Sequence, residues 1–297
     1  MKTEEKPVIS APAVRTLAFL ALLLGGAALG LSPILVRLAD VGPTASAFWR
    51  LALALPFLWL WVALQGRGTP RAPGALLHAA LLAGVFFAAD LGVWHWSITY
   101  TTVANATLLA NFAPIFVTLG GWWLFGSRVS GLFLAAMITA LAGTALLVGP
   151  HFALGGARLA GDALGLLTAV FYAAYMLCIK RARETVSTAL LMALSTTVSV
   201  VLLLPVAALS PQPLLPGSAR GWGTVFALAL VSQVLGQSLI AYAFAHLSAA
   251  LSSVAVLTQP LVAAVLAWWL FNEVLALPQL FGGALVLIGI FIARRTG

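Results

Sequence analysis

The sequence predicts an all-α membrane protein with ten transmembrane helices arranged as two inverted five-helix repeats. Three observations predict this fold class: a composition that is 62% hydrophobic and only 7% charged, a series of apolar stretches of spanning length, and an internal repeat. Soluble proteins carry about 25% charged residues because their surfaces face water. A chain with so little charge cannot cover a water-facing surface, so most of its exterior is expected to face lipid.

Short polar segments divide the chain into ten apolar stretches, most of them long enough for the roughly 20 helical residues that cross a bilayer. They are residues 14–38, 44–64, 74–98, 102–125, 130–149, 160–181, 188–208, 221–245, 248–271 and 277–293. The first stretch begins beside Arg15 as a signal peptide would. Its apolar run continues to Val36, beyond the ~7–15 residues typical of a cleaved signal, so we expect it to remain as a span.

The basic residues favour one side of the membrane. With the N-terminus inside, eleven of the fifteen fall at the cytoplasmic ends of spans: Lys2, Lys6, Arg15, Arg67, Arg71, Arg128, Lys180, Arg181, Arg183, Arg294 and Arg295. Such an excess is typical of cytoplasmic segments, and it predicts that both termini are cytoplasmic. The net charge of +8 does not indicate nucleic-acid binding, because the basic residues stand singly between apolar runs rather than in one patch.

An internal repeat relates the two halves of the chain. The segment from Trp122 to Gly126 recurs at 268–272, a shift of 146 residues, and the same shift places Pro114 on Pro260 and Gly143 on Gly289. We therefore predict two domains, residues 1–150 and 151–297. An odd number of helices in each half places the second half upside down relative to the first. Inverted repeats of this kind are typical of secondary transporters, whose binding sites lie near the bilayer midplane.

Several motifs resemble a known family. The tract Ala-Phe-Trp-Arg-Leu-Ala at 47–52 and the repeated segments 104–143 and 250–289 are similar to the EamA-type members of the drug/metabolite transporter superfamily. Residues 90–96, Asp-Leu-Gly-Val-Trp-His-Trp, most resemble the YddG-type aromatic amino-acid exporters of bacterial inner membranes. The resemblance implies a secondary transporter of broad specificity that exports aromatic and other large neutral amino acids across the cell inner membrane by alternating access.

One position departs from the family pattern. Family members commonly carry a Glu at the ends of the fourth and the ninth helix. Glu273 matches the second of these positions, whereas Ser127 occupies the first. The resemblance therefore implies no acidic role at the end of the fourth helix.

Uncharged polar side chains occur near the expected midplane on helices of both halves. They are Asn111, Tyr172, Tyr175, Gln233, Gln237 and Gln259. Amides are poorly placed against lipid, so we expect them to face the bundle interior. Each could form an interhelical hydrogen bond. As a set they predict a substrate pocket whose amides contact both ends of a zwitterion and whose tyrosines hold an aromatic side chain.

Two charges lie inside the predicted spans, Arg50 on the second helix and Asp90 on the third. Adjacent antiparallel helices would place both roughly 9–12 Å below the outer surface. One interpretation is an ion pair that locks the two helices together. The other is that Asp90 attracts a substrate ammonium or carries a proton, with proton coupling of export, while Arg50 meets the substrate carboxylate. The repeat maps Asp90 onto Gly236, which is expected to leave open space beside Gln237.

Three prolines interrupt predicted spans and are expected to act as flex points during alternating access: Pro33, Pro114 and Pro260. A proline cannot donate a backbone hydrogen bond. The carbonyls of Ala110 and Val256 are therefore expected to lose their helical partners, and free carbonyls at this depth could line an aqueous cavity. The alternative is a simple kink that shapes each helix.

Other classes of protein fit the sequence less well. An enzyme would need a nucleophile with a base or clustered carboxylates and histidines, and the sequence offers neither. No cofactor or metal is expected, because the four histidines lack ligand spacing and Cys178 is the only cysteine. The expected partners are a small-molecule substrate, namely amino acids, and the lipid bilayer, and no nucleic acid. A channel-like facilitator, or an exporter of another small metabolite or drug, remains the alternative.

Overall fold

The structure is a computed structural model that describes residues 11–65, 74–148 and 159–296, and every regular element in these ranges is a helix. Within these ranges, ten helical units are long and apolar enough to cross a membrane, which confirms the predicted fold class. In the first half, span 1 is α1 (Ala11–Gly30) with α2 (Ser32–Leu38), span 2 is α3 (Pro43–Ala52) with α4 (Leu55–Leu64), span 3 is α5 (Gly74–Tyr100), span 4 is α6 (Val103–Ala110) with α7 (Ala113–Phe125), and span 5 is α8 (Gly131–Val148).

The second half has the same number of spans. Span 6 is α9 (Leu159–Ala182), span 7 is α10 (Thr188–Ala208), span 8 is α11 (Ala219–Leu228) with the π-helical segment η3 (Ala229–Gln237) and α12 (Ser238–His246), span 9 is α13 (Ala249–Ala255) with α14 (Thr258–Phe271), and span 10 is α15 (Leu277–Thr296). The predicted boundary at residues 150 and 151 lies outside the described residues.

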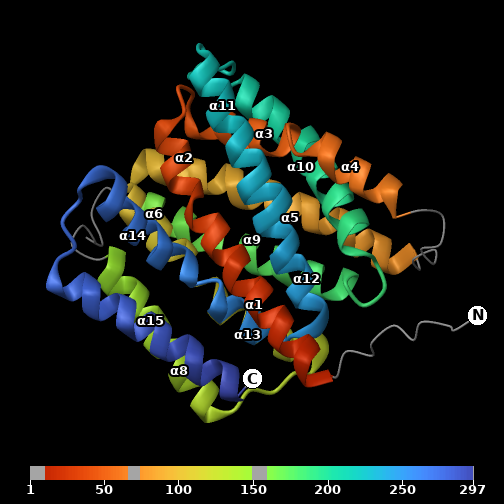
Figure 1. The fold of residues 1–297 in the computed structure, drawn as a ribbon, viewed down its shortest axis with the longest axis vertical. Coiled ribbons are helices and arrows are strands. Elements are labelled where there is room, and N and C mark those ends of the chain that lie inside the picture. Colours follow the sequence, from red (N-terminus) through yellow and green to blue (C-terminus); the bar gives the residue numbers. More distant parts are fainter. Residues whose placement is uncertain (1–10, 66–73, 149–158, 297) are drawn as a thin grey trace, which may run out of the picture.

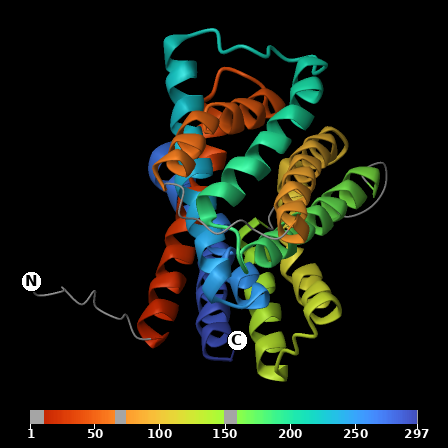
Figure 2. The same ribbon diagram turned by 90° about the vertical axis from the view of Figure 1, so that its right-hand side faces the viewer.

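The spans run between two ends of the molecule. The helix α1 begins and α15 ends at the same end, the lower one in Figure 1, and we call this end the N side. The opposite end is called the far side. Figure 2 shows the connection between α10 and α11, residues 209–218, at the far side. The basic-residue count predicts that the N side is cytoplasmic.

Spans 4 and 9 are interrupted at equivalent positions. In span 4 the helix breaks at residues 111–112, and in span 9 it breaks at 256–257. Pro114 and Pro260 lie in the first turn of the helix that follows each break, where the missing N–H has no helical acceptor to bond. The repeated prolines therefore begin new helices at matching places in the two halves.

The ends of these spans repeat in detail. Thr102 and Ser248, which are 146 residues apart, each accept a hydrogen bond at a helix N-terminus from the backbone N–H three residues later. Gly126 and Asn272, also 146 apart, end α7 and α14 in the left-handed conformation, with φ of 63° and 54°. Glycine and asparagine adopt this conformation most readily. The sequence repeat is thus a structural repeat.

Spans 5 and 10 pack against each other through small residues. Figures 1 and 2 show α8 and α15 side by side. A Cβ added to Gly143 would lie 2.5 Å from the carbonyl oxygen of Gly282, and one added to Gly289 would lie 2.6 Å from that of Ala136. The shift of 146 relates Gly143 to Gly289 and Ala136 to Gly282. The contact is therefore symmetric between the halves, and its small residues allow the two backbones to approach.

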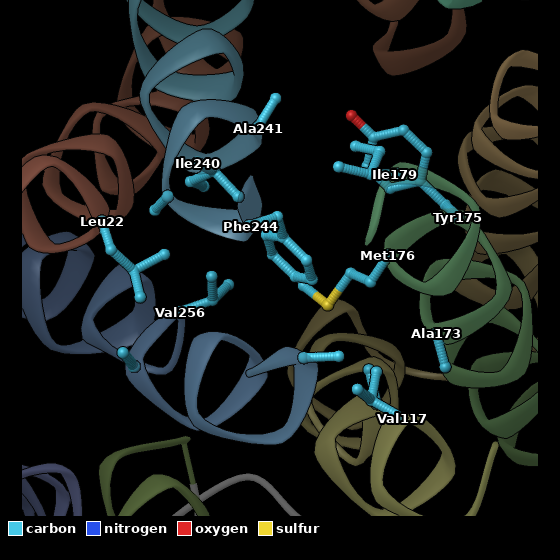
Figure 3. Close-up of a cluster of buried hydrophobic side chains, with 14 of the residues drawn as sticks. Leu22, Val117, Ala173, Tyr175, Met176, Ile179, Ile240, Ala241, Phe244 and Val256 are labelled. Carbon is cyan, nitrogen blue, oxygen red and sulfur yellow. The ribbon is translucent and has the colours of Figure 1, made fainter. Parts of the chain in front are cut away.

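A buried hydrophobic cluster fills the N-side half of the bundle. Phe244 lies next to Met176 at its centre, with Leu22, Val117 and Val256 around them (Figure 3). These five residues belong to spans 1, 4, 6, 8 and 9, and each lies within about 16 Å of the N-side end of its span, at 1.5 Å per residue. We call this group the N-side cluster. It closes the centre of the molecule toward the N side.

Two basic residues at the end of span 6 bind the N-side end of span 8. Lys180 Nζ donates to the carbonyl oxygens of Phe244 and Leu247 at 2.9 and 2.8 Å, and Arg183 Nε donates to that of Ala241 at 3.2 Å. The last carbonyls of a helix have no intrahelical partners and carry partial negative charge. These bonds hold α12 against α9 around the N-side cluster.

Candidate functional site

A cavity of about 230 Å³ lies between the two halves, on the far-side face of the N-side cluster. Seven spans contribute to its wall: Leu29, Gly30, Ser32, Pro33, Arg50, Phe87, Asp90, Leu91, Trp94, Thr107, Ala110, Asn111, Thr168, Tyr172, Gln237, Gln259, Pro260 and Ala263. All of these except Gln237 lie within about 20 Å of the far-side end of their span. We call it the central cavity.

Arg50 and Asp90 face the central cavity, and each is 9% exposed. Although both belong to the described residues, they form no ion pair within 4.0 Å. The Arg50 guanidinium instead lies over the ring of Phe87, 5.5 Å from its centroid, and its buried Nε has no hydrogen-bond partner. The structure therefore brings the two predicted charges to one cavity, close enough to attract each other but without a direct ion pair.

Tyr175 lies behind the cavity wall. Its hydroxyl donates to Gln237 Oε1 at 3.1 Å, and this glutamine lines the cavity. The Tyr175 ring stacks on Phe87 at 4.6 Å and on Tyr172 at 5.9 Å between centroids. Of the two predicted tyrosines, Tyr172 contacts the cavity and Tyr175, only 1% exposed, supports it from behind.

Gln233 points away from the central cavity. Its Nε2 donates to Thr196 Oγ1 of span 7 at 2.9 Å, in a fully buried contact. Gly236 does not open space beside Gln237, because a Cβ there would lie 3.3 Å from the carbonyl oxygen of Gly25 in span 1. The expectation of a free space at Gly236 is wrong, since this glycine instead permits a close contact between two helices.

Asn111 and Gln259 line the cavity from the broken spans 4 and 9. Asn111 follows the last residue of α6, and its Nδ2 donates to the carbonyl oxygen of Thr107 at 2.8 Å. Gln259 lies in the first turn of α14 with its amide near the Tyr172 hydroxyl, and its buried Nε2 forms no well-aligned hydrogen bond. The two helix breaks thus place one amide from each half at the cavity.

The three prolines predicted as flex points differ in their position relative to the central cavity. Pro33 and Pro260 line the cavity, whereas Pro114 does not. The expectation that the Val256 carbonyl loses its partner is wrong, because it accepts a hydrogen bond from the Gln259 backbone N–H at 3.0 Å. A tighter turn at the break replaces the bond that Pro260 cannot donate.

Sequence reasoning missed part of the cavity wall. Ser32, Phe87, Trp94, Thr107 and Thr168 line it, and all but Ser32 have no feature in the sequence that separates them from packing residues. Ser32 offers one signal, because it precedes Pro33 at a helix break. Its hydroxyl donates to Ser232 Oγ of span 8 at 2.6 Å and so joins the two halves beside the cavity.

A second buried carboxylate lies near the far side. Asp162, 4% exposed, is in the first turn of α9, and its Oδ1 accepts from Thr101 Oγ1 at 2.7 Å and from Asn105 Nδ2 at 3.1 Å. A carboxylate in the first turn of a helix is stabilised by the helix dipole. Asp162 thus connects span 6 to the start of span 4 and does not line the central cavity.

The Glu273 carboxylate lies outside the cavity. It forms an exposed ion pair with Arg37 at 2.5 Å, and the Arg37 guanidinium lies 4.2 Å from the centroid of Phe271. This contact joins the far-side ends of spans 1 and 9. Within the described part of the chain, no three His, Cys, Asp or Glu side chains come together as a metal site would require.

Ten apolar spans in the described ranges, a structural repeat of inverted halves and a cavity between them lined by both polar and apolar side chains define a membrane transporter of the inverted-repeat class. The model of the EamA-like transporter family matches residues 16–149 and 159–295, so the chain belongs to this family.

Several known proteins are similar to this chain. The pseudopaline exporter CntI of Pseudomonas aeruginosa (strain UCBPP-PA14) is 27% identical over 256 residues, covering 84% of this chain and 85% of the relative. An uncharacterized transporter of Archaeoglobus fulgidus is 30% identical over 199 residues, 67% of this chain and 70% of its own length. A solved crystal structure with 18% identity has the same fold, with a TM-score of 0.81 over 96% of this chain and 97% of its own.

Proposed function

We propose that this protein exports amino acids, aromatic and other large neutral ones among them, across a bacterial cytoplasmic membrane by alternating access. One observation carries the proposal: Arg50 and Asp90 face the same cavity without a direct ion pair between them. An unpaired buried charge is costly. A zwitterionic cargo supplies both missing partners, because its carboxylate suits Arg50 and its ammonium suits Asp90.

The size of the cavity supports a small cargo. Its volume of about 230 Å³ lies below the roughly 300–1,000 Å³ of sites that hold drug-sized ligands. Aromatic rings of Phe87, Trp94 and Tyr172 line it beside the charged groups. Such a wall suits a molecule with one polar end and one apolar end.

The position of the cavity supports alternating access. The N-side cluster closes the bundle below the cavity, so the described arrangement corresponds to a state closed toward the N side. With the N side in the cytoplasm, release would occur on the outer side. Opening toward the N side requires α12 to leave α9, which breaks the Lys180 bonds to Phe244 and Leu247.

Similarity supports export as the direction of transport. A relative that covers most of this chain is named as an exporter of pseudopaline. A different small metabolite is therefore the second candidate cargo. Proton coupling through Asp90 is a further part of the proposal, because Asp90 is the acidic side chain in the cavity wall.

The test is transport by purified protein in liposomes, with labelled phenylalanine, leucine, alanine, lysine and glutamate. We expect uptake of phenylalanine and leucine, weaker uptake of alanine and little of the two charged amino acids. A pH gradient that accelerates uptake by the wild type but not by Asp90→Asn would support proton coupling. Equal, unsaturable flux of all five would contradict a carrier for neutral amino acids and favour a channel.

A further inference from the structure

We propose that the central cavity binds its cargo in one orientation, between a group of hydrogen-bond donors and a group of acceptors, and that Tyr175 is a positioning residue for the donor group. The donor group consists of Arg50, Gln237 and Gln259, and the acceptor group of Asp90 and Asn111. This inference rests on the proposed function and adds a requirement: the cargo carries both a free carboxylate and a free ammonium.

Tyr175 determines how the Gln237 amide is turned. An amide side chain has an oxygen that accepts and an NH₂ that donates. The Tyr175 hydroxyl donates to Gln237 Oε1 at 3.1 Å from behind the cavity wall. The reversed amide could donate to the hydroxyl oxygen, but the buried Tyr175 O–H would then have no acceptor among the described residues. The Gln237 Nε2 is therefore held as the end of the amide that is available to the cavity.

Gln259 and Arg50 supply further donors. Gln259 Nε2 and Arg50 Nε are both buried and form no well-aligned hydrogen bond, although the Gln259 amide lies near the Tyr172 hydroxyl, and both residues line the cavity. Buried donors are seldom left unsatisfied, because each costs about 1–3 kcal/mol. Two unsatisfied donors in one wall, next to the oriented Gln237, indicate a site for an anionic oxygen. A carboxylate, with about four acceptor positions, satisfies several donors at once.

The acceptor group lies on spans 3 and 4. The Asn111 Nδ2 is committed to the Thr107 carbonyl oxygen at 2.8 Å, which leaves its Oδ1 as the available atom. The Asp90 carboxylate receives no hydrogen bond from the described side chains. An ammonium has three donors and no acceptor. It therefore suits the oxygens of Asp90 and Asn111, with the carboxylate of the same cargo on the opposite wall.

The amides of Asn111 on span 4 and Gln237 on span 8 both line the cavity, but Asn111 presents an acceptor to it and Gln237 presents a donor. A hydrogen bond outside the cavity fixes each of them: the bond to Thr107 uses the nitrogen of Asn111, and the bond from Tyr175 uses the oxygen of Gln237. The side chain of the cargo is left to the aromatic wall of Phe87 and Trp94. Recognition of the carboxylate and the ammonium of the cargo is thus separate from recognition of its side chain, so different side chains can be accepted.

Binding of labelled phenylalanine to the purified protein tests the assignment, with displacement by two analogues. Phenylalaninamide lacks the carboxylate, and N-acetylphenylalanine lacks the ammonium. In the wild type we expect each analogue to bind roughly 10- to 100-fold more weakly than phenylalanine, the range for losing hydrogen bonds to charged groups. Tyr175→Phe and Gln237→Leu should reduce the penalty for phenylalaninamide by a few-fold, because Arg50 and Gln259 still contact the carboxylate, and leave that for N-acetylphenylalanine unchanged.

Asp90→Asn should show the reverse pattern, with a smaller penalty for N-acetylphenylalanine only. Tyr242→Phe is the matched control, because it removes a hydroxyl from a tyrosine outside the cavity wall, and it should behave as the wild type does. A variant that is merely less stable would weaken all three ligands equally. Where Tyr175→Phe does not fold, Gln259→Leu tests the same donor group.

The outcomes separate the two proposals. If phenylalanine binds and is transported but phenylalaninamide binds equally well, the donor group is refuted and the proposed function stands. If the Tyr175→Phe penalties equal those of the wild type, Tyr175 has no positioning role. If phenylalanine and leucine neither bind nor cross the membrane with the wild type, the proposed function fails and the orientation fails with it.

Discussion

Replacing Asp90 by Asn and Arg50 by Gln, singly and together, distinguishes cargo contacts from a structural ion pair. The two charged groups lie more than 4.0 Å apart. At an effective dielectric constant of about 20 their attraction is therefore below about 4 kcal/mol. Direct hydrogen bonds to a charged cargo are worth about 1.5–3 kcal/mol each. Each single substitution should consequently raise the half-saturation concentration for phenylalanine by roughly 10- to 100-fold.

The double variant distinguishes contacts with the cargo from a structural ion pair. If the two charges bind opposite ends of the cargo, the double variant should transport no better than either single variant, with losses that approach their sum. A structural pair predicts instead that the double variant recovers activity relative to either single variant, since no charge is then left unpaired. The assay is initial uptake into liposomes, corrected for the amount of correctly folded protein. Recovery in the double variant would refute the assignment of Arg50 and Asp90 to the cargo.

Three further predictions test the fold around the cavity. Gly143→Ala should lower the free energy of unfolding in detergent by about 1–3 kcal/mol, because the added Cβ meets the backbone of span 10. The control Gly223→Ala, another helical glycine but with nothing within 4 Å, should not lower it and should raise it by up to about 1 kcal/mol. Phe244→Ala should open the N-side cluster and raise the passive leak of phenylalanine at low temperature; an unchanged leak would remove the cluster as a barrier. Reporter fusions after Thr185 and after Gly217 should report the cytoplasm and the outer side respectively, and an inverted result at either would contradict the topology.

The architecture could be predicted because its determinants are local or repeated. Spanning length and apolar composition identify a membrane helix without knowledge of its neighbours. The match of Pro114 to Pro260 located two helix breaks, and the match of 122–126 to 268–272 located two helix ends that the structure shows in equivalent conformations. Each feature depends on one segment of chain, so one sequence is enough to reveal it.

The cavity wall could be predicted only in part, because position along a helix gives depth but not direction. Arg50, Asp90, Asn111, Gln237 and Gln259 have the predicted depth and also face the cavity. Gln233 and Tyr175 have a similar depth but bond to neighbouring helices. Which face of a span points inward depends on the packing of all ten, and no pattern within one helix contains that information.

The sequence also does not show whether a glycine lies at an interhelical contact or beside a cavity. Gly236 corresponds by the repeat to Asp90, which suggested an empty position opposite a charge. In the structure it permits the approach of span 1 at Gly25. A glycine at an interhelical contact and a glycine beside a cavity have the same sequence signature, because in both cases the absent side chain is the feature that matters.

The most direct test of the central claim is counterflow of labelled phenylalanine into liposomes that were loaded with unlabelled phenylalanine. A carrier that exposes one cavity to each side in turn should accumulate label transiently above its equilibrium level, with leucine inside also effective and lysine inside ineffective. Locking α12 to α9 by a cross-link on the N side should abolish this overshoot, because the cavity could no longer open to that side. A simple approach to equilibrium without overshoot, unaffected by the internal amino acid, would contradict alternating access through the central cavity.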